Sequence, residues 1–142
     1  MTKSKTKDPT QNITPSLILH YLAVCLIAFW MLFGAYGHFF HPEFFYKLVP
    51  DFLPKWEVVI LTGIPELLIG LGVLFPRTRP VAGLGFTLLC LAFLPLHLWD
   101  LVREDPAITP QSAAIFRVFL QFFLMWVGWK VWTRWRPQIS KA

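Results

Sequence analysis

Four apolar stretches, each close to 20 residues long, constrain this chain more than any other feature. A run of about 20 apolar residues is long enough for an α-helix to cross the hydrocarbon core of a bilayer. Hydrophobic residues make up 56% of the chain and charged residues only 15%, which is too apolar for an ordinary soluble domain. The sequence therefore predicts an all-α, multi-pass integral membrane protein, a four-helix bundle with the lipid bilayer as its main partner. The expected helices cover residues 17–36, 57–75, 81–98 and 113–132.

Two connections between these helices have distinct compositions. Residues 38–56 are rich in aromatic side chains and contain three prolines, which prevent a continuous helix. This segment is expected to be an interfacial loop with its aromatic rings at headgroup depth. The Pro-Arg-Thr-Arg-Pro turn at residues 76–80 is so short that the second and third helices must form an antiparallel hairpin. The expected divisions of the chain are a basic N-terminal segment (1–14), one transmembrane domain (15–132) and a basic tail (133–142).

The distribution of cations predicts the orientation. Lysine and arginine are enriched in cytoplasmic loops, and an arrangement with both termini inside places nine cations on the inner side and three on the outer side. The inner cations are Lys3, Lys5, Lys7, Arg77, Arg79, Lys130, Arg134, Arg136 and Lys141, and the outer ones are Lys47, Lys55 and Arg103. We therefore expect an N-in/C-in orientation. The expected location is the bacterial inner membrane. Since these cations lie at the ends of apolar runs and form no basic stripe, a nucleic-acid partner is not expected.

The first apolar run has a second interpretation, a cleaved signal peptide. Lysines precede this run, and Ala35, Tyr36 and Gly37 at its end form a small-x-small pattern. The run is longer than the apolar core of a usual signal peptide. A transmembrane helix is therefore the preferred interpretation.

Glu66 lies inside the second apolar run, about 13 Å below its outer end at the rise of an α-helix. An ionisable side chain at this depth costs free energy unless it has a partner, is neutral or faces a water-filled cavity. Gly63 and Gly70 lie on nearly the same helical face and allow close helix approach. The carboxyl group is therefore expected to point into the bundle. Its role is either to bind a ligand or to hold the helices together as a neutral hydrogen-bonding group.

The fourth helix carries a matching polar face. Arg117 and Gln121 are one turn apart and share this face with Ala114 and Gly128. Gln121 is expected at the depth of Glu66, and Arg117 could reach either Glu66 or Asp100. The alternative for Arg117 is to extend toward the outer headgroups.

Three of the four histidines are also expected at the outer side. His38 and His41 follow the first helix, and His97 ends the third helix shortly before Asp100. Pro65 and Pro95 lie next to these polar groups and are expected to kink the second and third helices, which would open space for a ligand. The sequence thus predicts an outward-facing polar pocket. Its candidate ligand-binding residues are Glu66, Arg117, Gln121, His97, His38 and Asp100.

Cysteine usage points to neither a disulfide framework nor a metal site. Cys25 and Cys90 each stand alone in an apolar run, without a CxxC motif or a Cys/His spacing typical of zinc sites. Both are expected to be packing residues that could meet near the middle of the membrane. No metal ligand and no catalytic residue is assigned.

Several short motifs resemble those of the DoxX-like family of four-helix membrane proteins. They are Gly37-His38-Phe39 with Pro42, Leu61-Thr62-Gly63-Ile64-Pro65-Glu66, and Leu74-Phe75-Pro76-Arg77-Thr78-Arg79, followed by Arg117 and Gln121. The resemblance covers most of the chain from Leu17 to Trp132 and implies a four-helix bundle with a glutamate in the second helix. Some members of that family are associated with quinone-linked sulfur oxidation, and some distant relatives act as receptor-assembly chaperones. Similar bundles that reduce quinones use a CxxC motif, which this chain lacks.

Two functions follow as expectations, and whether the protein is an enzyme is left open. The first is a redox-associated accessory protein whose outward pocket binds a quinone or another small molecule. The second is a non-enzymatic chaperone or complex subunit, with a membrane or periplasmic protein as partner, in which the polar cluster is structural. A haem held by His97 with His38 or His41 is the least favoured cofactor, and transport or proton relay is a further alternative.

Overall fold

The computed structural model describes residues 14–136, and within this range the chain is helical with no β-strand. This confirms the all-α prediction. The elements are α1 (Pro15–Phe40), the 3₁₀ helix η1 (Pro42–Leu48), α2 (Lys55–Gly72), α3 (Arg79–Val102) and α4 (Gln111–Trp135). Residues 1–13 of the expected N-terminal segment and residues 137–142 of the expected tail lie outside the described range.

Three helices, α1, α3 and α4, are long and apolar enough to cross a membrane, which is consistent with a membrane protein. The fourth predicted span, α2, is not among them. This helix has 18 residues, so it is about 27 Å long, slightly less than the hydrocarbon thickness of a typical bilayer. It also includes Lys55, Glu57 and Glu66, which lower its mean hydropathy.

The helices begin and end at somewhat different residues than expected. α1 continues to Phe40, so His38 belongs to its last turn and not to the following loop. α4 continues to Trp135, so the first residues of the expected tail are helical. The aromatic connection between α1 and α2 is not an open loop, because η1 folds within it from Pro42 to Leu48.

The four α-helices form two closely packed pairs, α1 with α2 and α3 with α4. Glycines allow the two helices of each pair to approach each other closely. A Cβ atom on Gly70 of α2 would lie 2.8 Å from Cγ of Leu32 in α1, and a Cβ on Gly128 of α4 would lie 2.8 Å from the carbonyl oxygen of Gly83 in α3. Small residues at such positions let helix backbones approach each other closely.

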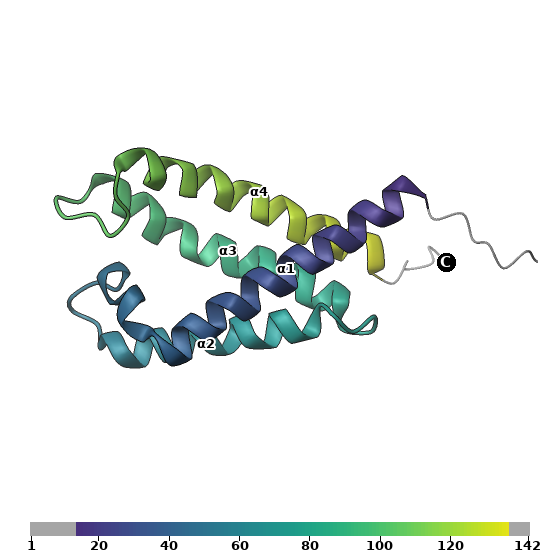
Figure 1. The fold of residues 1–142 in the computed structure, drawn as a ribbon, viewed down its shortest axis with the longest axis horizontal. Coiled ribbons are helices and arrows are strands. Elements are labelled where there is room, and N and C mark those ends of the chain that lie inside the picture. Colours follow the sequence, from purple (N-terminus) through teal and green to yellow (C-terminus); the bar gives the residue numbers. More distant parts are fainter. Residues whose placement is uncertain (1–13, 137–142) are drawn as a thin grey trace, which may run out of the picture.

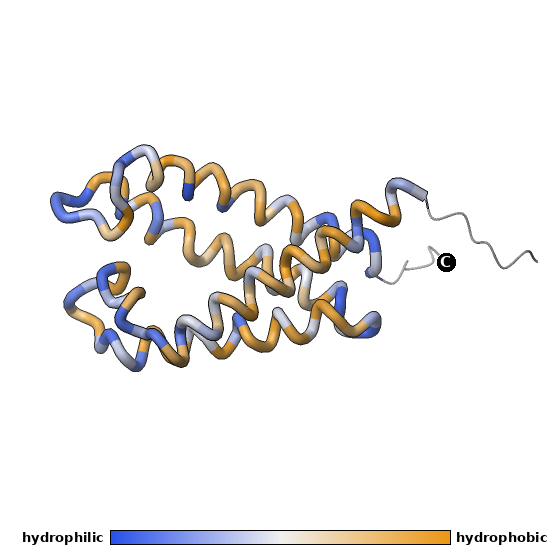
Figure 2. Tube along the Cα trace, in the orientation of Figure 1, coloured by the Kyte–Doolittle hydropathy of each residue, from blue (hydrophilic) through white to orange (hydrophobic). Residues whose placement is uncertain are grey.

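The two pairs converge at one end of the bundle and diverge at the other. Figure 1 shows α2 and α3 joined by a tight turn at the convergent end, where α1 also crosses toward α4. We call this the hairpin end, and the opposite end, where η1 lies, the η1 end. Figure 2 shows that the helices are largely apolar, with hydrophilic residues gathered in the connections at both ends. Large apolar side chains are exposed along the helices, as expected for surfaces compatible with lipid contact.

Arg79 holds the hairpin end together. This residue is buried, with its Nε donating to the carbonyl oxygen of Val73 and its Nη2 to that of Leu74, both at 3.0 Å. Its guanidinium group also lies 5.0 Å from the ring centre of Trp135 in α4 and 5.5 Å from that of Tyr21 in α1. In the sequence Arg79 was only an orientation signal, whereas in the structure it connects all four helices.

At the η1 end, polar contacts tie η1 to the connection between α3 and α4. The Lys47 ammonium group lies 2.8 Å from a carboxylate oxygen of Asp105. The Arg103 guanidinium group donates to the carbonyl oxygen of Lys47, also at 2.8 Å. η1 therefore bridges the two diverging helix pairs.

Candidate ligand-binding site

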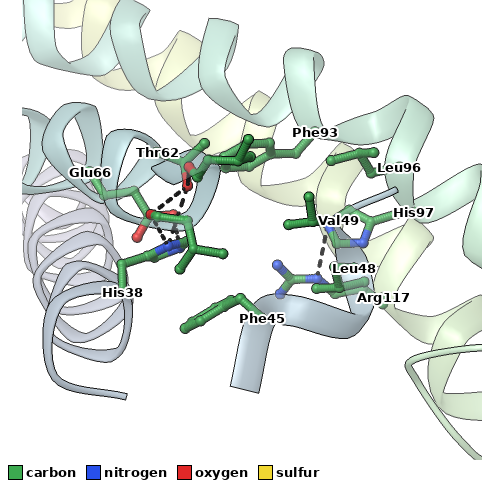
Figure 3. Close-up of a pocket in the computed structure, with 12 residues that line it drawn as sticks. His38, Phe45, Leu48, Val49, Thr62, Glu66, Phe93, Leu96, His97 and Arg117 are labelled. Atoms are coloured by element: carbon green, nitrogen blue, oxygen red, sulfur yellow. Dashed lines mark hydrogen bonds and ion pairs between the residues drawn. The ribbon is translucent and has the colours of Figure 1, made fainter. Parts of the chain in front are cut away.

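A cavity of about 110 Å³ lies at the η1 end between the two helix pairs. Four of the six predicted ligand-binding residues line it, namely His38, Glu66, His97 and Arg117. Figure 3 shows that they form two groups on opposite sides of the cavity, His38 and Glu66 on one side and His97 and Arg117 on the other. The remaining lining residues are Phe45, Leu48, Val49, Val58, Val59, Thr62, Phe93 and Leu96.

The first polar pair joins α1 to α2. Nδ1 of His38 lies 2.8 Å from the carbonyl oxygen of Val59, and because a carbonyl only accepts, this ring nitrogen carries a proton. Nε2 then faces Oε1 of Glu66 at 3.6 Å. The ring of Phe45 stacks on the imidazole, with centres 3.9 Å apart and planes within 15°. The orientation of His38 is thus fixed from three sides.

The Glu66 carboxyl group is only partly satisfied by this arrangement. The residue is 6% exposed, and its Oε2 is buried without a hydrogen-bond partner among the described residues. Gly34 of α1 lies against this oxygen, where a Cβ atom would overlap it. Glu66 therefore points into the bundle as predicted, in a space that exists because residue 34 has no side chain.

The second polar pair joins α3 to α4. Nε of Arg117 donates to Nε2 of His97 at 3.4 Å, so Nε2 acts as an acceptor and the ring proton is on Nδ1. That Nδ1 is buried and has no partner among residues 14–136. The Arg117 guanidinium group also lies 5.3 Å from the ring centre of Trp30 in α1, and in Figure 3 it points toward the side of the cavity that holds His38.

The expected contacts of Arg117 were wrong. Among the ion pairs of the described residues there is none between Arg117 and Glu66 or between Arg117 and Asp100. Because the two helix pairs diverge at this end, Glu66 and Arg117 face each other across the cavity, and each contacts a histidine of its own pair instead.

Asp100 and Gln121 lie outside the lining of the cavity. The Asp100 carboxylate accepts hydrogen bonds from the backbone amides of Ala107 (2.7 Å) and Ile108 (3.0 Å) and forms an ion pair with Arg103 (2.7 Å). It thus holds the connection between α3 and α4. Gln121 donates to the carbonyl oxygen of Cys90 at 2.7 Å, an oxygen that in a regular α-helix accepts from the amide of Leu94. Both residues have structural partners, so the structure corrects their expected place in the pocket.

Sequence reasoning missed several residues of the site. Thr62 lies one turn before Glu66, and its hydroxyl is 3.3 Å from Nδ1 of His38, a position that helical spacing alone could have indicated. Phe45 and Trp30 were not identified because their roles depend on how η1 folds back and how α1 approaches α4. Neither arrangement has a local sequence signal.

The cysteines and potential metal ligands form no further site in the described part of the chain. Cys90 is buried and Cys25 is exposed, and both are free thiols, so the expectation that both are packing residues was wrong for Cys25. No group of three or more His, Cys, Asp or Glu side chains within residues 14–136 is arranged to hold a metal ion.

The fold and the cavity define a class of protein: within the described residues it is helical, has three helices long and apolar enough to span a membrane, and has two polar pairs, each with a buried histidine, that line one cavity. Residues 27–132, well over half of the chain, match the family described as a domain of unknown function (DUF8561), and the chain belongs to this family. No curated protein and no solved structure matches it.

The family match overturns the resemblance to the DoxX-like family. That resemblance rested on short motifs of glycine, proline and arginine around Glu66 and the helical hairpin. Glycines that allow close helix packing are common in membrane helix bundles of many kinds. Such motifs therefore do not identify one family.

Proposed function

We propose that the protein binds a small molecule with a polar head, for which a quinone is the leading candidate, in the cavity between the two polar pairs. One observation carries this proposal. Oε2 of Glu66 and Nδ1 of His97 are both buried without a partner among the described residues, and they belong to opposite sides of the same cavity. Buried polar atoms are nearly always hydrogen-bonded. Two unpartnered atoms on residues that line one cavity therefore favour a bound molecule that forms hydrogen bonds with them.

The chemistry of the two walls suits a quinone head. A para-quinone is a flat ring with acceptor oxygens at opposite ends, and Arg117 can donate to one of them. The other can accept a hydrogen bond from the opposite wall, either from Nε2 of His38 or from the Glu66 carboxyl group in its protonated form, while Phe45 and the aliphatic lining contact the ring face. In this role the protein is an accessory that holds the quinone for a redox partner.

The proposal includes a fourth span and an orientation. α2 can cross the membrane despite its lower hydropathy, because the Glu66 carboxyl group is buried against His38 and Lys55 and Glu57 lie at the helix start. The excess of cations near the hairpin end and the two termini favours the cytoplasmic side for that end. The η1 end and its cavity then face the periplasm of a bacterial inner membrane.

The test is quinone retention by the protein purified in mild detergent, measured by native mass spectrometry and by extraction. Glu66→Ala and Arg117→Ala should each lower retention by about tenfold or more, since a hydrogen bond to a charged group contributes about 1.5–3 kcal/mol. The matched controls are Glu43→Ala and Arg77→Ala, which make the same chemical changes at exposed positions.

The thermal midpoint of each variant separates binding from the structural alternative. If the polar cluster only holds the helices together, the two site variants will lower the midpoint while the wild-type protein retains no quinone. Retention that is equal in the site variants and their controls would also refute the proposal.

A further inference from the structure

A second cavity, of about 430 Å³, adjoins the first and is lined mainly by aromatic side chains of α1 and η1. We call it the aromatic groove. Phe29 and Phe33 line it while each is 67% exposed, so the groove opens on the apolar flank of the bundle. Its principal aromatic residues are Phe29, Trp30, Phe33, Tyr36, Phe44 and Phe45.

The groove and the polar cavity have two polar residues in common. Glu66 and Arg117 line both. The unpartnered Oε2 of Glu66 lies against Gly34, which belongs to the groove lining. The Arg117 guanidinium group contacts His97 on the cavity side and Trp30 on the groove side. A molecule lying in the groove can therefore place a polar end at the orphaned carboxyl oxygen.

The other approach to the cavity, along the bundle axis from the η1 end, is covered. Leu48 and Val49, at the end of η1, line the cavity on this side. The neighbouring Lys47 is fixed to the α3–α4 connection through Asp105 and Arg103, both at 2.8 Å. η1 thus lies between the polar cavity and the end of the bundle, whereas the groove joins the cavity to the apolar flank.

We infer that the ligand enters sideways from the bilayer through the aromatic groove and is an amphiphile whose apolar tail stays there. This inference rests on the proposed function and adds the class of ligand and its route. The tail lies against the aromatic side chains of α1, and the head reaches the two polar pairs. A water-soluble metabolite does not fit this geometry, because the groove opens onto apolar surface.

The test uses a benzoquinone with a ten-carbon tail that carries a diazirine at its middle, added to the protein in lipid nanodiscs. After irradiation, the adducts are mapped by peptide mass spectrometry with and without excess unlabelled decyl-benzoquinone. We expect labelling within residues 29–37 of α1 that the competitor removes. Labelling by lipid-like contact alone would persist in the presence of competitor.

Two matched variants test the groove itself. Phe33→Ala should lower the competed labelling by about fivefold, the equivalent of one lost aromatic contact. Phe119→Ala removes a similarly exposed phenylalanine on α4 that does not line the groove, and it should label like the wild type. Both positions are exposed, so neither substitution should prevent folding.

The outcomes separate this inference from the proposed function. If quinone is retained but the competed adducts fall on residues 47–49, which do not line the groove, the ligand passes η1 from the aqueous side. The inference is then wrong, while the proposed function stands. If labelling of residues 29–37 is not competed, the inference is likewise overturned. If the protein neither retains quinone nor shows competed labelling at any position, both are wrong.

Discussion

Replacing Arg79 by alanine should destabilise the protein strongly, because this side chain connects all four helices at the hairpin end. Two of its nitrogens donate to carbonyl oxygens at the end of α2, and its guanidinium group contacts aromatic rings of α1 and α4. The residue is 6% exposed, so water cannot replace these contacts in the folded protein. Alanine would leave the carbonyl oxygens of Val73 and Leu74 without these donors.

The expected loss of stability in Arg79→Ala follows from these contacts. Hydrogen bonds that involve a charged group contribute about 1.5–3 kcal/mol each, and a cation–π contact about 0.5–2 kcal/mol. Part of this is offset by the free energy that is needed to desolvate the guanidinium group. We expect a net loss of about 3 kcal/mol in the free energy of unfolding for Arg79→Ala. Arg79→Lys keeps the charge but not the fork of donors, so it should lose about half as much.

The assay is reversible unfolding in mixed detergent micelles, followed by circular dichroism, with Arg77→Ala as the control. Arg77 is two residues away and exposed, so its removal should change the free energy of unfolding by no more than about 0.5 kcal/mol. Both variants remove one cation from the same turn, so any effect on membrane orientation is matched. Equal stability of the two variants would show that the buried contacts of Arg79 contribute nothing, and the reasoning would be wrong.

Three further predictions concern helix packing and the site. Gly128→Ala puts a Cβ against the backbone of α3 and should lower the free energy of unfolding by about 1–3 kcal/mol. The control, Gly72→Ala, meets only ordinary contacts and should leave the free energy of unfolding nearly unchanged in the same assay. Asp100→Ala removes the acceptor of two backbone amides and should lower the free energy of unfolding by about 2 kcal/mol; an unchanged value would refute its role in the α3–α4 connection. Gly34→Ala should displace the Glu66 carboxyl group and reduce quinone retention while the thermal midpoint stays near that of the wild type, and unchanged retention would contradict the role of this glycine.

Local sequence features were sufficient to predict the helices and the inward position of Glu66. The apolar runs indicated the helices, and the spacing of Gly63 and Gly70 indicated which face of α2 packs against a neighbour. Helix ends were less predictable. α1 continues through His38 to Phe40 because nothing in Gly-His-Phe-Phe stops a helix before Pro42.

The partners of the polar residues could not be predicted, because they depend on distances between helices. Arg117 was expected to reach either Glu66 or Asp100, because it shares a helical face with Gln121, which matches Glu66 in depth. Neither depth nor charge indicates the lateral separation of Glu66 and Arg117. The structure separates them by the divergence of the two helix pairs and gives each a histidine. Asp100 was a candidate pocket residue because it follows His97 at the outer end of the third helix. In the structure its carboxylate instead accepts hydrogen bonds from two backbone amides of the α3–α4 connection.

The sequence by itself therefore determined what each segment is: apolar helices, a proline-rich connection, and buried faces marked by small and ionisable residues. These properties depend on residues within a few turns of each other, so the spacing of those residues in the sequence predicts them. Only the tertiary structure decided that two helix pairs diverge at the η1 end, that η1 covers the opening, and that Glu66 and Arg117 face one cavity across it. The reason is physical: helix crossing and loop placement result from packing between segments far apart in the chain, for which no local pattern exists.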